Sequence, residues 1–345
     1  MSTETDHTQT PAVKPKKRWK RAVRLVVAAL LLVLLFTQVP VGKVAEALRG
    51  VQLGPVLIAV LVTAAAQVAL AWRLKRLAAV NGAVLSLGRV LEINLTTRFY
   101  GLFVPGGNLA GNTIRFVRLA REQEHIAGTA LALAVDRILA TLSLGLVGFA
   151  FFAWVRPPEG LPWLAALCVV TGGCVALILP AIAGVRYGRG LAGRLWRKHV
   201  RDRMPGPVVK VVRKAASIAR QTERIPPSRL AEALGWSVLM HGLGAAAYWQ
   251  LAHALGLELT FAEGGWGRTA MLVATLLPIS FAGIGLREGA AVVALGALGI
   301  AGDVSVAFSL LCFVVTILGP GVVGGILEAG RWMIGGSKKA NPPKA

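Results

Sequence analysis

Residues 278–288 read P-I-S-F-A-G-I-G-L-R-E and lie between two apolar stretches. Two charges, Arg287 and Glu288, come directly after a turn that would interrupt a helix. That turn contains Pro278, Ser280, Gly283 and Gly285. In a membrane protein, broken backbone and ionised side chains are tolerated at depth only where they face protein or a wet cavity. The stretch is therefore predicted to be a site, and the alternative is a short loop at the membrane surface.

The composition of the whole chain is typical of a membrane protein. Of its 345 residues, 55% are hydrophobic, and the mean hydropathy is +0.64. Stretches without Asp, Glu, Lys or Arg recur at residues 25–42, 50–72, 138–155, 160–185, 233–257, 269–286 and 304–327. Because a helix of roughly 20 apolar residues can cross a bilayer, the sequence predicts an all-α polytopic membrane protein.

The net charge of +22 has two possible explanations, nucleic acid or a membrane surface. The distribution of Lys and Arg favours the membrane. Thirty of the 38 basic residues fall in segments that can all lie on one side, and only four, including Arg268, fall on the other. Under the positive-inside rule, the basic side and both termini are cytoplasmic. Arg89, Arg98, Arg137 and Arg287 belong to neither group and need a separate explanation.

The predicted organisation is a disordered basic tail at residues 1–20, a transmembrane domain at 21–335 and a cytoplasmic tail at 336–345. A basic linker at residues 186–229 lies within the domain. Six full transmembrane helices are expected near residues 22–40, 53–72, 126–154, 161–185, 230–253 and 304–328. We interpret the first as a retained anchor and not as a signal peptide, because it is about 18 residues long.

Two further segments are interrupted and too short for paired spans. Between basic clusters at 73–76 and 115–121, only residues 99–114 are free of charge, and they contain Pro105, Gly106 and Gly107. This pattern predicts a re-entrant hairpin from the cytoplasmic side. Residues 269–302 predict a second hairpin from the opposite side, although two full spans remain an alternative. Oppositely oriented broken hairpins in the two halves suggest an inverted repeat.

Three motifs resemble those of a known family. P-x-S-x-x-G-x-G-x-R-E at residues 278–288 resembles the signature of the lysylphosphatidylglycerol synthase transmembrane region, also called the flippase-like domain family. P-G-G-N-x-x-G-N-x-x-R at residues 105–115 is similar to its earlier motif, except that Asn112 stands where an acidic residue is common. Val135-Asp136-Arg137 resembles its acidic-Arg pair. The resemblance covers roughly residues 20–335.

The resemblance implies a bacterial or archaeal cytoplasmic-membrane protein that moves a lipid between leaflets. Longer family members add a soluble domain that aminoacylates phosphatidylglycerol, and the chain as given has no room for one. We therefore expect transport and no enzymatic activity.

The candidate site residues are those suited to an anionic headgroup. Arg binds phosphate oxygens in a bidentate fork and stays charged, and glycines let the backbone approach a ligand closely. The predicted headgroup-binding residues are Arg287, Glu288, Arg98, Arg115, Gly106, Gly107, Asn108, Ser280, Gly283 and Gly285. Asp136 and Arg137 are predicted to form a coupling or structural ion pair. One alternative is that Arg287–Glu288 and Asp136–Arg137 are purely structural, paired across the two hairpins to hold the fold together. Another is that Arg115 is a cytoplasmic anchor.

Two other features have weaker interpretations. His241 is interpreted as a hydrogen-bonded packing residue, with proton relay as the alternative. The G-x-x-x-G spacing from Gly321 to Gly325 predicts close helix packing.

The predicted function is translocation of an anionic phospholipid, glycolipid or polyprenyl-phosphate-linked lipid across the inner membrane. The alternative is a membrane-embedded anchor for a lipid-modifying or glycosyl-transferring enzyme. No metal, cofactor or nucleic acid is expected. Partners are a membrane lipid and, as further possibilities, a lipid-synthesising protein or a second copy of the chain.

Overall fold

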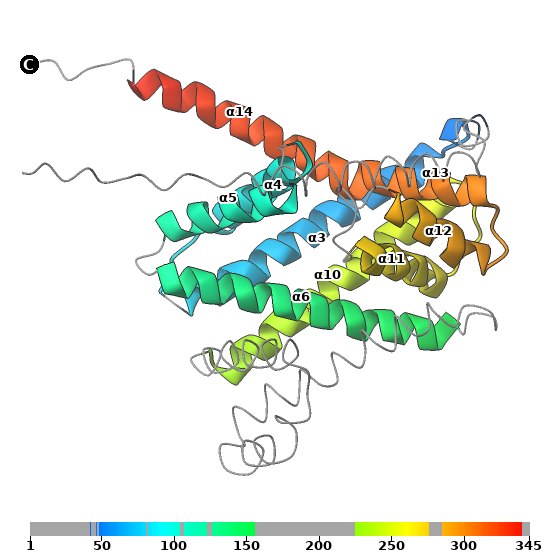
Figure 1. Ribbon diagram of the computed structural model, residues 1–345, viewed down its shortest axis with the longest axis horizontal. Helices are drawn as coiled ribbons and strands as arrows, with labels where there is room; N and C mark the ends of the chain where they lie inside the picture. The colour runs from blue at the N-terminus through cyan, green and yellow to red at the C-terminus, as the bar shows by residue number, and fades with distance from the viewer. Residues whose placement is uncertain are drawn as a thin grey trace, which may run out of the picture.

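The computed structural model describes residues 42, 46, 48–80, 82–103, 107–122, 126–155, 225–275 and 285–339 (Figure 1). Within these ranges the chain forms helices and no strand, as predicted. The predicted crossings near residues 22–40 and 161–185, most of the basic linker and the tails at 1–20 and 340–345 lie outside the described residues.

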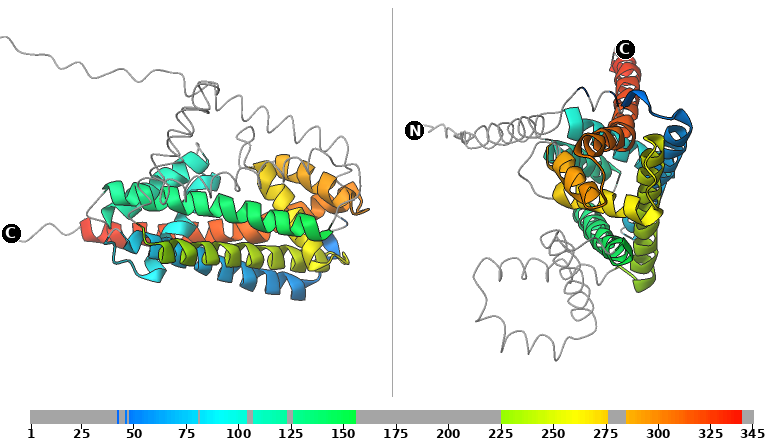
Figure 2. Two further views of the ribbon diagram at one scale, coloured as in Figure 1. Left: turned by 90° about the horizontal axis from the view of Figure 1, so that it is seen from below. Right: turned by 90° about the vertical axis from the view of Figure 1, so that its right-hand side faces the viewer.

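Long helices run side by side along the length of the protein (Figure 2). They are α3 (Leu53–Ala79), α6 (Ile126–Val155), α10 (Pro227–Ala254) and a continuous segment of α13 (Gly302–Phe313), a π-helical turn (Val314–Leu318) and α14 (Gly319–Lys339). Three stretches of the described chain are long and apolar enough to cross a membrane: Leu53–Ala79, Gly128–Val155 and Gly302–Arg331. The protein is therefore membrane-embedded.

Helix α10 is long enough to cross a membrane, at 28 residues, but is less apolar than those three. Its sequence contains His241, His253 and Gln250 among glycines and alanines. One face of α10 is buried by its neighbours, including His241 and Tyr248. His241 therefore faces protein, whereas Gln250 and His253 are only partly buried.

Four shorter helices complete the described structure. They are α4 (Leu87–Phe103, 17 residues), α5 (Asn108–Arg121, 14), α11 (Phe261–Thr275, 15) and α12 (Leu286–Gly296, 11). At 1.5 Å per residue, each is shorter than the roughly 30 Å hydrocarbon core of a bilayer. Helices α4 and α5 lie toward one end of the bundle, and α11 and α12 toward the other (Figures 1 and 2).

Contacts at the two ends show that α3 and α10 are antiparallel. The amide of Gln52 donates to the carbonyl of Ala254 at 2.8 Å. Near the other ends of these helices, the Arg76 guanidinium contacts the Glu232 carboxylate at 2.6 Å. We call the end that contains Arg76 and Glu232 the Arg-rich end.

Glycines on α14 allow it to approach α4 closely. A Cβ at Gly324 would lie 2.1 Å from the carbonyl oxygen of Leu95, and one at Gly325 would lie 2.8 Å from the ring of Phe99. Gly321 similarly faces Leu102. The close packing predicted from the G-x-x-x-G spacing is confirmed.

Replacing Gly324 with alanine is expected to destabilise the protein by about 1–3 kcal/mol, because the added methyl overlaps backbone that cannot move aside easily. Thermal unfolding in detergent measures this loss. Gly330→Ala is the matched control, since a Cβ there meets nothing within 4 Å. Equal stability of the two variants would contradict the close contact between α14 and α4.

Candidate functional site

A cavity of about 140 Å³ lies halfway along the long helices. Helices α3, α4, α10 and α11 and the π-helical turn all contribute to its wall. Its polar lining consists of Thr63, Gln67, Arg98, Tyr248, Arg268 and Thr316. Segments that are far apart in the sequence therefore line the same cavity.

Arg268 reaches this cavity from α11. Its guanidinium lies 5.8 Å from the ring centre of Tyr248, and a nitrogen of the group contacts Nδ1 of His241 at 3.3 Å. Gly244 provides the necessary space, because a Cβ there would lie 2.5 Å from Cζ of Arg268. An aromatic ring, a histidine and a glycine thus position this charge.

His241 is buried and has hydrogen-bonding contacts on both ring nitrogens. Its Nε2 lies 3.1 Å from the carbonyl oxygen of Ala140, which can only accept, so Nε2 carries the proton. Nδ1 is then free to accept from Arg268. His241 occupies the position of a hydrogen-bonded packing residue, the first of the two interpretations from sequence.

Arg98 projects from α4 into the same cavity. It has no hydrogen bond or ion pair within the described part of the chain, and the positive charges of Arg115 and Arg268 repel it. No carboxylate occurs among the described residues that line the cavity. Arg268 is buried and Arg98 is half-buried. Because a charge held away from water without a counter-charge is costly, two uncompensated guanidinium groups here indicate a site for an anion.

Two more polar atoms contribute to this argument. The hydroxyl of Thr63 and the amide oxygen of Gln67 are buried without a hydrogen-bond partner in the described structure. Buried polar groups usually have a partner. Both residues line the cavity beside the two arginines, where a ligand or water would complete their hydrogen bonds.

The π-helical turn lies directly against this cavity. Thr316 and Ile317 of the turn line it, and Pro320 follows in α14. Proline has no N–H to bond the carbonyl four residues earlier, at Thr316, and this removes one α-helical hydrogen bond. π-helical turns occur frequently at functional sites.

The sequence prediction for Arg268 was wrong. Arg268 was assigned to the side opposite the basic segments, but it is only 9% exposed and lies in the interior. The run Gly264-Gly265-Trp266-Gly267 directly before it was the available signal. Gly264 and Gly265 let α11 pack closely against Trp249 and Phe151.

Asp136 forms its ion pairs with residues other than Arg137. Both Nε and Nη2 of Arg73 lie 2.8 Å from one Asp136 oxygen, and Nη2 of Arg115 lies 3.2 Å from the other. Ser237 accepts a further hydrogen bond from Arg73 at 2.8 Å. Arg137 is exposed. The predicted pairing of Asp136 with Arg137 is therefore corrected, and the ion-pair cluster joins α3, α5, α6 and α10.

Arg115, predicted to bind a headgroup, lies in this cluster and outside the cavity lining. Two of its nitrogens, Nε and Nη2, are buried without a well-aligned hydrogen bond. Arg115 is close enough to Arg98 for the two charges to repel each other. Arg115 is therefore part of the Asp136 cluster and not of the cavity wall.

Arg287 and Glu288 pair with each other within α12, so a structural role agrees with the alternative from sequence, but the predicted pairing across the two hairpins is corrected. Both are 2% exposed, and the guanidinium of Arg287 also donates to Ser309 and lies 4.4 Å from the ring centre of Phe313. The second carboxylate oxygen of Glu288 accepts from the amide of Gly285, which has a φ of +83° at the start of α12. Removing Arg287 would leave Glu288 buried without its partner, so such a variant tests folding and not ligand binding.

The remaining predicted site residues are only partly described. Gly107 has a φ of +53° at the start of α5, as expected for a glycine turn. Asn108 is the first residue of α5. Gly106, Ser280 and Gly283 lie outside the described residues. Whether these glycine turns contact a ligand stays a prediction.

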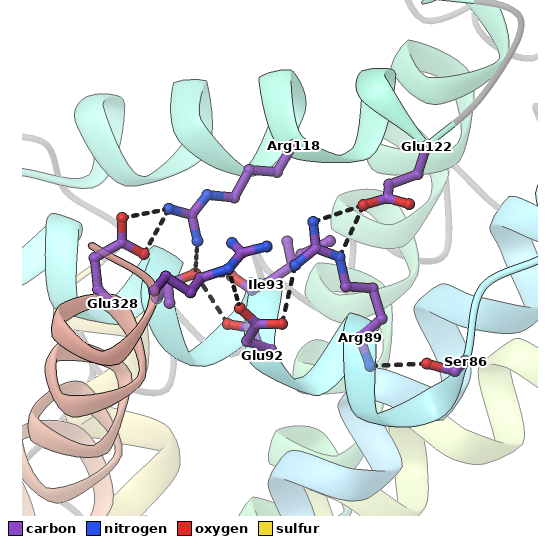
Figure 3. Close-up of polar contacts among 9 residues, drawn as sticks. Ser86, Arg89, Glu92, Ile93, Arg118, Glu122 and Glu328 are labelled. Carbon is purple, nitrogen blue, oxygen red and sulfur yellow. Dashed lines mark hydrogen bonds and ion pairs between the residues drawn. The ribbon is translucent and has the colours of Figure 1, made fainter. Parts of the chain in front are cut away.

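An ion-pair network holds α4, α5 and α14 together at the Arg-rich end (Figure 3). Arg118 donates to both oxygens of Glu328 at 2.6 and 2.7 Å and to the hydroxyl of Thr96 at 2.9 Å. Arg89 joins Glu122 and Glu92, and Glu92 also contacts Arg331. All these arginines have carboxylate partners, so they differ from Arg98 and Arg268.

The comparison with protein families agrees with this architecture. The family model described as "Lysylphosphatidylglycerol synthase TM region" matches residues 21–324. The chain belongs to this family. The resemblance noted at residues 105–115, 135–137 and 278–288 is thereby confirmed. Membership in the lysylphosphatidylglycerol synthase TM-region family supports a function related to membrane lipids. No curated protein matches the chain.

Proposed function

We propose that this member of the lysylphosphatidylglycerol synthase TM-region family translocates an anionic lipid between the leaflets of the bacterial or archaeal cytoplasmic membrane. The observation that carries the proposal is the central cavity, which holds Arg98 and Arg268 without a carboxylate among its described lining. An anion in hydrocarbon has a high free energy unless its charge is offset. The two guanidinium groups would offset the headgroup charge at the deepest point of its path.

The position of the cavity supports this proposal. It lies near the middle of Leu53–Ala79 and of Gly302–Arg331, two segments that can span a membrane. If these segments span the bilayer, as the proposal requires, the site would lie near the bilayer midplane. Transporters with inverted repeats bind their substrates at that depth.

The short helices provide the second part of the proposed mechanism. In our proposal α4–α5 and α11–α12 are re-entrant hairpins that enter from opposite sides, with the Arg-rich end in the cytoplasm. Arg98 comes from the first pair and Arg268 from the second. Movement of one pair relative to the other would open the cavity to one leaflet at a time, without a chemical change to the lipid.

Reconstitution of the purified protein into vesicles tests the proposal. A phospholipid with a fluorescent label and an anionic headgroup is placed in both leaflets, and a membrane-impermeant reductant then bleaches the label that it can reach. Translocation predicts that the label becomes fully accessible with protein and stays about half accessible in protein-free vesicles. Half accessibility in both would contradict translocation and favour the anchor role.

Replacing Gly244 with alanine is expected to slow translocation about tenfold, equivalent to ~1.4 kcal/mol. The new methyl would lie 2.5 Å from the Arg268 guanidinium carbon and displace that group from its place beside Tyr248. The vesicle assay measures the change. Gly242→Ala, two residues away on α10, meets nothing within 4 Å and should keep the wild-type rate. If both variants transport equally, the position of Arg268 does not matter.

A further inference from the structure

We propose that the cavity takes the terminal phosphate monoester of a lipid and discriminates against phosphodiester headgroups. The inference rests on the proposed function and narrows its substrate class. Three features of the cavity support it: its charge, its size and the chemistry of its walls.

The charge of the cavity matches a dianion. Arg98 and Arg268 provide two positive charges, and no described lining residue provides a negative one. A phosphate monoester carries about −1.5 to −2 near neutral pH because its second pKa is about 6, whereas a diester carries a single charge. Each guanidinium can bind two oxygens, and the three terminal oxygens of a monoester can serve both arginines.

The cavity is too small for a large headgroup. Its volume of about 140 Å³ is below the range of roughly 300–1,000 Å³ that is typical of small-molecule pockets. A phosphate group fits this space, whereas a phosphate with glycerol or a sugar beyond it would have to extend out of the cavity.

The apolar part of the wall disfavours such an extension. Leu70, Met240, Leu272 and Ile317 form much of the lining that the arginines do not. A lipid phosphate monoester has a single substituent on its phosphate, the lipid part itself, whose hydrocarbon chains suit these side chains. The second substituent of a diester is polar in common phospholipids. It would compete with the phosphate for the polar lining residues or lie against these apolar side chains and lose its hydrogen bonds.

An amine-bearing headgroup is disfavoured for a further reason. The ammonium group of a zwitterionic lipid would lie close to Arg98 and Arg268 and be repelled by both. No carboxylate within the described lining could offset this repulsion. The site therefore favours a phosphate without an accompanying cation.

The pH dependence of binding can show whether a change in affinity comes from ionisation of the ligand or from ionisation of the protein. The titratable and charged groups nearest the cavity are Arg98, Arg115, His241, Tyr248, Arg268 and Cys312. Arg73 of α3 and Arg287 of α12 act on His241 and Tyr248 from farther away. Of all these, only His241 belongs to a residue type that ordinarily titrates between roughly pH 5 and 7.5. The charge of a diester ligand is constant over this pH range, so its affinity would change only if His241 titrates. The diester is therefore the control for ionisation of the protein.

The test measures ligand affinity by thermal stabilisation of the purified full chain in detergent. The probes are dioctanoyl phosphatidic acid, dioctanoyl phosphatidylglycerol, dioctanoyl phosphatidylethanolamine and inorganic phosphate. We expect the monoester to bind about tenfold more tightly than the diester at roughly pH 7.5, and the ratio to fall toward one at about pH 5, where the monoester carries one charge. Arg98→Gln should remove the preference, and Arg137→Gln, at an exposed position, should keep it.

Equal affinity for monoester and diester at the higher pH would overturn the inference, and so would a ratio that does not change with pH. Inorganic phosphate binding as tightly as the monoester lipid would identify a free-anion site and contradict the lipid assignment. If Arg98→Gln does not fold, loss of the preference in Gly244→Ala supports the inference and its persistence opposes it.

Translocation of phosphatidylglycerol as fast as phosphatidic acid would support the proposed function while refuting this selectivity. Selective binding of the monoester without translocation would support the selectivity and contradict the proposed function.

Discussion

Arg268→Gln is expected to slow translocation of an anionic lipid by roughly 10- to 100-fold, because a hydrogen bond to a charged group contributes about 1.5–3 kcal/mol. Glutamine keeps part of the side-chain volume, but it cannot offset the phosphate charge. The protein itself should fold normally, since Arg268 has no carboxylate partner within the described structure. The vesicle bleaching assay measures the rate.

Two variants make this result interpretable. Arg268→Lys keeps the charge but loses the fork that binds two oxygens, so its rate should lie between those of wild type and Arg268→Gln. Arg137→Gln removes an equal charge from an exposed position and should transport at the wild-type rate. A wild-type rate for Arg268→Gln, with normal folding, would remove Arg268 from the transport path.

Asp136→Asn is expected to cost about 3–5 kcal/mol of stability, because it leaves buried positive charges without their counter-charge. Arg73 is 1% exposed and makes two 2.8 Å contacts with Asp136, and Arg115 depends on the same carboxylate. The asparagine side chain has nearly the same shape, so the effect isolates the lost charge. Thermal or denaturant unfolding in detergent measures it.

Arg137→Gln is again the control, since it changes the next residue of α6 on its exposed side. Surface changes of this kind usually stay within about 0.5 kcal/mol. A loss of similar size in both variants would mean that Asp136 is not the centre of the cluster.

Much of the fold could be predicted from sequence because hydropathy depends on local composition. Residues 53–72, 126–154 and 304–328 were predicted as crossings, and the structure has apolar helices at Leu53–Ala79, Gly128–Val155 and Gly302–Arg331. The close packing of α14 was readable too, since glycine spacing acts within one helix, but its partner α4 was not. The motifs at residues 105–115 and 278–288 led to the correct family.

The partners of the charged residues could not be read in the same way. Asp136 and Arg137 are adjacent on a helix and point to different sides, so Asp136 pairs instead with Arg73, 63 residues away. Arg287 does reach its neighbour, because Glu288 turns back to cap the start of α12. Such pairings depend on which helices pack together, and a single sequence does not contain that information.

Arg268 was missed for a related reason. Counting charges left four arginines unassigned but placed Arg268 on the side opposite the basic segments, because a charge-free stretch begins directly after it. Of the arginines singled out as needing another explanation, Arg98 alone lines the cavity, while Arg287 is neutralised by Glu288. Which arginines have a carboxylate partner and which do not can be seen only once the packing of α4, α10 and α11 is known.

Native mass spectrometry of lipid retained by the purified protein tests most directly whether an anionic headgroup binds in the cavity. We predict one anionic lipid bound to each wild-type chain. Retention should be strongly reduced in the double variant Arg98→Gln/Arg268→Gln and unchanged in Arg137→Gln. Undiminished retention of the same anionic lipid by the double variant would show that the cavity is not where the headgroup binds.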